Sequence, residues 1–187
     1  MRCFVAVELT ETVRKRLAGL QQRFSDLGRS VRWVRPDAMH LTVKFLGDVP
    51  DQQLPAASQA VADVARQCRP FEFAVRSTGC FPPRGNVRVI WVGVEETSGE
   101  LAACKRRCED AFSALGFPRE SRPFSPHLTL GRVKDPRRAG NLRQLIAAQA
   151  DFKAGTVSAG ELVLFESRLS PQGAQYAVVH RGVLASP

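Results

Sequence analysis

The sequence predicts an α+β fold with two pseudo-symmetric lobes, in which mainly antiparallel sheets line a central groove and helices lie outside. The tetrad HLTV at residues 40–43 recurs, about half the chain later, as HLTL at residues 127–130. Segments with the two-residue period of a strand also alternate with segments that have the period of a helix. We therefore expect a duplicated unit whose two His-Thr strands face one another across the groove.

In the N-terminal half, apolar segments of strand length alternate with two helical segments. The first helix follows Thr10, a good N-cap residue, and ends by Gly28, while the second covers residues 51–67. Strands are expected at residues 4–9, 31–34 and 39–46.

The rest of the chain combines strands with two more helices. Ser98 is suited to cap a helix that reaches about Leu115, and a shorter helix is expected at residues 141–150. Strands are expected at residues 71–75, 87–94, 127–133, 157–165 and 176–183.

The length of 187 residues suits a single domain, residues 1–187, made of two intertwined lobes. No apolar run approaches the roughly 18 residues of a membrane span, and the N-terminus has too short an apolar run for a signal peptide. We therefore expect a cytoplasmic protein with no membrane association.

The five cysteines are odd in number and widely spaced, which does not resemble a disulfide framework. Cys104 and Cys108 are four positions apart on a predicted helix, so a metal pair is conceivable there. No further cysteine or histidine lies at a ligand spacing nearby, and buried free thiols are the preferred interpretation.

The net charge of +9 favours a polyanionic partner such as nucleic acid, although basic proteins are common and the arginines form no long run.

Two of the three histidines open the repeated tetrad. On a strand, residues i and i+2 share a face, so each histidine lies beside the threonine two positions later. Two imidazoles that flank a phosphate can act as base and acid at neutral pH without a metal or cofactor. His40 and His127 are thus the candidate proton carriers, and Thr42 and Thr129 the candidate contacts to phosphoryl oxygens. Which histidine is the acid stays open on this reasoning, because the halves are alike.

The residues around both tetrads resemble the paired motifs of the 2H phosphoesterases. The segments that carry the resemblance are HLTVKFLG at residues 40–47 and FSPHLTLGR at residues 124–132. Within that superfamily the chain is most similar to RNA 2′,3′-cyclic phosphodiesterases, also called LigT-like proteins or 2′-5′ RNA ligases. Further segments that look like family landmarks are RCFVAV at 2–7, GCFP at 79–82, IWVGV at 90–94 and LFESRL at 164–169.

The resemblance implies a metal-independent hydrolase that opens a 2′,3′-cyclic phosphate at an RNA 3′ end and leaves a 2′-phosphate, with reversible 2′-5′ ligation. It implies that His40 is the proton donor and His127 the proton acceptor. Arg132 matches an arginine that often follows the second motif, so it is a candidate substrate contact. Its strand parity places it opposite His127 unless Gly131 introduces a bulge. Lys44 follows the parity of His40 and is a second candidate substrate contact.

Other interpretations keep part of this chemistry. The substrate could be a small cyclic nucleotide or a 2′-5′ oligonucleotide, or the chain could be a non-catalytic RNA-binding module. The expected partner is RNA with a 2′,3′-cyclic phosphate or 2′-phosphate end, and a monomer suffices because one chain supplies both half-sites. Candidate base-stacking side chains, most of them expected in the core, are Phe4, Trp33, Phe45, Phe81, Trp91 and Tyr176.

Overall fold

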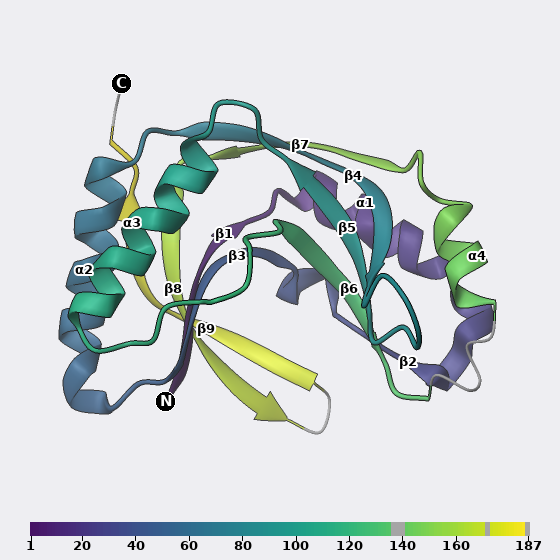
Figure 1. The fold of residues 1–187 in the computed structure, drawn as a ribbon, viewed down its shortest axis with the longest axis horizontal. Helices are drawn as coiled ribbons and strands as arrows, with labels where there is room; N and C mark the ends of the chain where they lie inside the picture. The colour runs from purple at the N-terminus through teal and green to yellow at the C-terminus, as the bar shows by residue number, and fades with distance from the viewer. Residues whose placement is uncertain (136–140, 171–172, 186–187) are drawn as a thin grey trace.

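The computed structural model describes residues 1–135, 141–170 and 173–185. Within these residues the strands form two sheets, and every strand pair is antiparallel (Figure 1). The first sheet has the order β3 (His40–Asp48), β1 (Arg2–Glu8), β8 (Glu161–Ser170), β9 (Gly173–Val183). The second has the order β2 (Val31–Trp33), β6 (His127–Val133), β5 (Val89–Glu95), β4 (Phe71–Phe81), β7 (Lys153–Ala159). The predicted α+β, mainly antiparallel fold is confirmed.

The two halves of the chain exchange strands between the sheets. Strand β2 comes from the N-terminal half but pairs with β6, and β8 and β9 come from the C-terminal half but extend the sheet of β1. The two HLT strands, β3 and β6, therefore belong to different sheets, and they contact one another.

Helices cover the outer sides of the sheets at the two ends of the molecule (Figure 1). Helix α2 (Leu54–Gln67) packs against β8 and β9, and α3 (Glu100–Ala114) against β3. Helix α1 (Glu11–Gln22) contacts β7, and α4 (Leu142–Ala147) contacts β4. Among the described residues, none of these helices has the length and apolar character needed to cross a bilayer.

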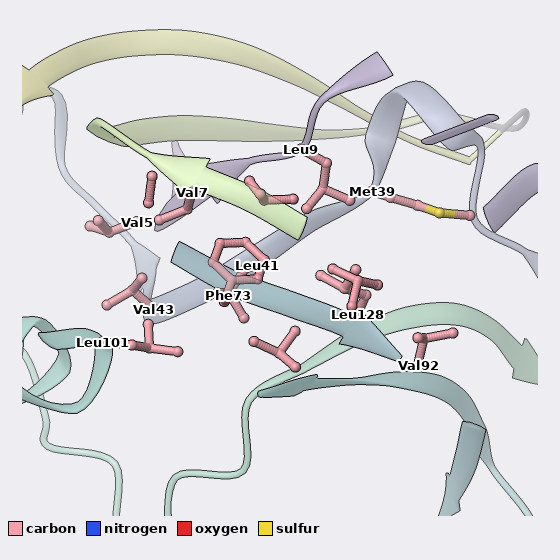
Figure 2. Close-up of a cluster of buried hydrophobic side chains, with 14 of the residues drawn as sticks. Val5, Val7, Leu9, Met39, Leu41, Val43, Phe73, Val92, Leu101 and Leu128 are labelled. Carbon is pink, nitrogen blue, oxygen red and sulfur yellow. The ribbon is translucent and has the colours of Figure 1, made fainter. Parts of the chain in front are cut away.

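One core cluster includes residues of both sheets. Its members include the apolar residues of the two tetrads, as Leu41, Val43 and Leu128 show in Figure 2. Leu41 and Leu128 are fully buried, so each tetrad is anchored by the residue that follows its histidine.

Several element boundaries differ from the sequence-based predictions. The segment 157–165 is not one strand, because Gly160 separates β7 from β8 and the chain changes sheet there. Strand β4 extends six residues beyond the predicted end at Val75, to Phe81. Helix α1 ends at Gln22, and a 3-10 helix follows at Ser25–Ser30. The N-cap prediction for Thr10 is confirmed, since its hydroxyl accepts a hydrogen bond from the Val13 amide, whereas the N-cap of α3 is Gly99 and not Ser98.

Candidate active site

The two histidines are held by the same local hydrogen bond. His40 Nδ1 lies 2.9 Å from the carbonyl oxygen of Ala38, and His127 Nδ1 lies 2.7 Å from that of Ser125. A carbonyl oxygen can only accept, so Nδ1 is the donor and carries the proton in both rings. In the neutral imidazole, Nε2 is then the nitrogen that is free to accept a proton. The two-residue spacing to the carbonyl is the same in both half-sites.

The two faces of each tetrad have the burial that strand parity predicts. His40 and Thr42 are half-buried, as are His127 and Thr129, whereas the residues between and after them are buried in the core. Each histidine therefore shares a face with its threonine, away from the apolar core.

A β-bulge follows each threonine and reverses this parity. In the β1–β3 pair, Ala6 is opposite Thr42 and Val5 is opposite Lys44, so Val43 is the extra residue. In the β5–β6 pair, Trp91 is opposite Thr129 and Ile90 is opposite Gly131, so Leu130 is the extra residue. The residue three positions after each threonine is thereby returned to the face of the histidine.

The bulge in β6 turns Arg132 toward His127. Arg132 is exposed and lies near enough to His127 for its positive charge to act on the imidazole. Burial is the main cause that lowers the pKa of His127, the hydrogen bond to Ser125 opposes it, and Arg132 adds to the lowering. The sequence allows for a bulge at Gly131, but the extra residue is Leu130, one position earlier.

The bulge in β3 turns Lys44 away from His40, so the expectation that Lys44 faces the groove is wrong. Lys44 is 2% exposed, and its Nζ donates to Glu109 Oε2 at 2.7 Å and to the carbonyl of Pro118 at 3.0 Å. Glu109 also accepts hydrogen bonds from Lys105 and from the amide of Glu120. Burial opposes ionisation of Glu109, but the bonds from Lys105 and Lys44 outweigh it, and the pKa of Glu109 is lowered. Lys44 therefore joins β3 to α3 and cannot reach a ligand on the histidine face.

His40 lies against aromatic rings. Its ring centroid is 4.5 Å from that of Phe4, in a stacked arrangement, and 5.1 Å from that of Tyr176, edge to face. Burial lowers the pKa of His40 to about 4; the hydrogen bond to Ala38 opposes this shift, and the charge of Arg14 adds to it. His40 is thus neutral at pH 7 in the unliganded protein.

Arg132 and Tyr176 connect the two half-sites. Burial raises the pKa of Tyr176, and the positive charge of Arg132 opposes that shift. Arg132 on the second sheet is therefore within electrostatic reach of both His127 and Tyr176, and Tyr176 on the first sheet touches His40. These residues bring the two half-sites into one cluster.

The aromatic candidates do not all lie near the histidines. Phe81 is edge to face with His127, with ring centroids 5.0 Å apart, and Trp91 is 6.4 Å from the same ring. Trp33 stacks instead on Phe24 and packs against the core cluster.

Two polar residues of α1 were not identified from the sequence. Gln21 Nε2 donates to the carbonyls of Val34 at 2.7 Å and Leu130 at 2.9 Å, so it holds the bulge of β6 in place. Arg14 is half-buried, and its Nε has no hydrogen-bond partner among the described residues. The sequence does contain a pattern that could have identified them, because Arg14 and Gln21 interrupt the apolar face of an amphipathic helix at a spacing of two turns.

The cysteines considered as a metal pair, Cys104 and Cys108, are fully buried free thiols. Across residues 1–135, 141–170 and 173–185, no three His, Cys, Asp or Glu side chains are grouped as metal ligands.

A model of the LigT like Phosphoesterase family matches the chain twice in tandem, over residues 7–91 and 92–176. Each match contains one HLT tetrad, as the predicted duplication requires. The chain is 36% identical over 178 residues to the RNA 2′,3′-cyclic phosphodiesterase of Methanothermobacter thermautotrophicus, covering 94% of this chain and 95% of that protein. It is 32% identical over 180 residues to the protein of the same name from Thermotoga maritima, covering 96% and 94%.

Solved structures share the fold. A protein of Thermus thermophilus superposes with a TM-score of 0.83 at 30% identity, covering 100% of this chain and 99% of that one. Escherichia coli LigT complexed with 3′-AMP superposes with a TM-score of 0.77 at 22% identity, covering 98% and 97%. At that identity the second likeness supports the fold alone.

Proposed function

We propose that this chain, which belongs to the LigT-like phosphoesterase family, is an RNA 2′,3′-cyclic phosphodiesterase that leaves a 2′-phosphate. The observation that carries the proposal is the repeated arrangement of an Nδ1-anchored histidine beside a threonine, once on β3 and once on β6. The printed names of the relatives supply the substrate class.

In the proposed reaction, His127 Nε2 accepts a proton from water, whose oxygen forms a bond to phosphorus. The bond from phosphorus to the ribose 3′ oxygen breaks, and protonated His40 donates its Nε2 proton to that oxygen. The products are a 3′-hydroxyl and a 2′-phosphate monoester. The Thr42 and Thr129 hydroxyls and the Arg132 guanidinium stabilise the negative charge that develops on the non-bridging oxygens.

The surroundings of the two histidines support this direction. The departing oxygen belongs to the ribose, so the nucleoside lies on the side of the acid, whereas water arrives at the base. Aromatic rings lie beside both histidines. What differs is the exposed Arg132 beside His127, which suits the phosphate and the attacking water and so supports this direction.

Substrate binding would favour the protonated form of His40 that the reaction needs. Burial keeps the pKa of His40 at about 4 in the unliganded protein. A phosphodiester bound beside the ring brings a negative charge that favours imidazolium, so the pKa rises in the complex. We therefore propose that His40 takes up a proton when the anion binds.

Ligation would use the same groups. An RNA 5′-hydroxyl, deprotonated by His127, would attack the cyclic phosphate in place of water, and a 2′-5′ linkage would form as the bond from phosphorus to the 3′ oxygen breaks and His40 protonates that oxygen. Because both half-sites lie in one chain and one core cluster spans both sheets, we propose that residues 1–187 form one domain and act as a monomer.

The test uses an RNA oligonucleotide that ends in a 2′,3′-cyclic phosphate, with the three histidine variants compared. His40→Ala and His127→Ala should each lower turnover by on the order of 10²–10⁴. His180→Ala is the matched control, since His180 lies on β9 and, within the described part of the chain, no bond or ring contact links it to the other two. Equal loss in all three variants would contradict a specific role of His40 and His127, and a wild type that binds the RNA without turnover would support a non-catalytic binding module.

A further inference from the structure

Phe45 differs from the aromatic rings beside it in its exposure. Its side chain is 64% exposed, whereas Phe4 is 3% and Phe165 is 7% exposed. A phenylalanine on a strand that faces solvent gives up the stabilisation that burial would bring. Single exposed apolar residues are common in soluble proteins, so the position of Phe45 decides whether the exposure has a use.

The bulge of β3 places Phe45 on the face of the candidate active site. In regular alternation, Phe45 would share the face of the buried Leu41 and Val43. Because Val43 is the extra residue, Phe45 is opposite Phe4 and lies on the side of His40 and Thr42. The same bulge turns Lys44 into the core and brings the phenyl ring outward.

Phe4 connects Phe45 to the catalytic ring. The Phe4 centroid is 4.5 Å from that of His40 and 6.2 Å from that of Phe45. Phe4 itself is covered, so Phe45 presents the solvent-facing end of this aromatic row. A flat apolar group attached to the ribose of a phosphate held at His40 would meet it.

The two half-sites differ in chemical character at this equivalent position. Phe45 and Arg132 each lie three residues after the threonine of their tetrad, and each is returned to the histidine face by the bulge between. One half-site therefore carries a cation there and the other an exposed aromatic ring. A nucleotide has the same two ends, a charged phosphate and a flat base.

We infer that the ring of Phe45 is the platform on which the nucleobase of the terminal nucleotide stacks. The inference rests on the proposed function, because it places the phosphate between His40 and His127. Every base has a π face, so such a platform accepts any RNA end, and purines gain more than pyrimidines from their larger ring system.

The experiment separates base binding from phosphate binding. The affinities of 2′-AMP and of inorganic phosphate are measured by calorimetry for the wild type, Phe45→Ala, Phe45→Leu and Phe45→Trp. Phe45→Ala and Phe45→Leu should weaken 2′-AMP binding by on the order of tenfold, and Phe45→Trp should restore it. Inorganic phosphate should bind all four proteins equally. Val183→Ala is the matched control, since Val183 is 65% exposed at the far end of β9 and should leave both affinities unchanged.

Three outcomes would overturn the platform: no 2′-AMP binding by the wild type, equal 2′-AMP affinity in Phe45→Ala, or a parallel loss of phosphate binding, which indicates damage to the His40 half-site. Hydrolysis of adenosine 2′,3′-cyclic phosphate is measured on the same proteins. Phe45→Ala should raise KM with little change in kcat. A wild type that binds 2′-AMP through Phe45 but opens no cyclic phosphate would contradict the proposed function and leave the platform standing.

Discussion

Phe4 stacks on His40, with ring centroids 4.5 Å apart and ring planes inclined by 25°. The stack covers one face of the imidazole with an apolar ring that is itself buried, and burial is the largest cause of the lowered pKa of His40. We expect Phe4→Ala to admit water and to raise the pKa of His40 from about 4 toward its ordinary value of 6.5. The measurement is an NMR titration of the imidazole ring protons.

His127 serves as the internal control in that titration. It lies on the other sheet and contacts Phe81 and Trp91 rather than Phe4. Its pKa should stay unchanged in Phe4→Ala. A His40 pKa that does not move would show that the stack does not set the ionisation of His40.

Stability should fall at acid pH because of His40. The pKa of His40 is lower in the folded chain than in the unfolded one, so the unfolded chain binds the proton first. The stabilising contribution is complete above pH 6.5 and is lost as the pH falls toward 4. At about 1.4 kcal/mol per pKa unit, the loss by pH 4.5 is about 2 to 3 kcal/mol.

The measurement is the free energy of unfolding in urea, determined at pH 7 and at pH 4.5 for the wild type and for His40→Gln. The decrease in the free energy of unfolding between the two pH values should be smaller in the variant by about that amount. Equal decreases would contradict the assigned pKa.

Anion binding should be coupled to proton uptake. Sulfate is a useful probe because it does not titrate between pH 5 and 7. Both histidines have lowered pKa values, so binding should tighten as the pH falls through this range. Calorimetry in buffers of different ionisation enthalpy should detect the bound protons. The pH dependence should weaken in His40→Gln or His127→Gln and vanish in the double variant; a pH-independent wild type would contradict proton uptake.

Arg132 should act on His127 through its charge. In Arg132→Gln, the loss of the positive charge should raise the pKa of His127 and weaken sulfate binding. Arg119→Gln is the control, since Arg119 is exposed and pairs with Asp110. If both variants change sulfate affinity equally, only the net charge matters and Arg132 has no local role.

Lys44 should contribute to stability rather than to ligand binding. Lys44→Met removes one partner of a buried ion pair, and we expect a loss of about 3 kcal/mol in the free energy of unfolding. Sulfate affinity should be unchanged. Lys15→Met is the comparison, since the exposed pair of Lys15 with Glu11 is worth less than about 1 kcal/mol. A Lys44→Met protein of full stability with weakened sulfate binding would support the original assignment of Lys44 to the ligand site.

The sequence predicted the parts of the site that depend on regular alternation. His40, Thr42, His127 and Thr129 could be assigned to their faces because a two-residue period relates them. The same period failed for Lys44, because a bulge is a property of strand pairing and Val43 carries no local signal for it. For Arg132, Gly131 indicated a bulge within one residue of its actual position at Leu130.

Other features depend on contacts between distant segments. The acceptors of the histidine Nδ1 protons are backbone carbonyls, which no residue type identifies. Gln21 acts on Leu130 across more than half of the chain, and the exchange of strands between the sheets follows from packing of the whole core. Local periodicity can indicate that Gln21 interrupts an apolar face but not which carbonyl it meets.

The most direct test of the two-histidine account is the identity of the product from an RNA oligonucleotide that ends in a 2′,3′-cyclic phosphate, incubated with the wild type in EDTA. Phosphorus NMR distinguishes the possible phosphomonoesters. The account predicts complete conversion to a 2′-phosphate and a 3′-hydroxyl, because His40 protonates the 3′ oxygen. Unchanged substrate, a strict requirement for a divalent metal, or a 3′-phosphate product would contradict it.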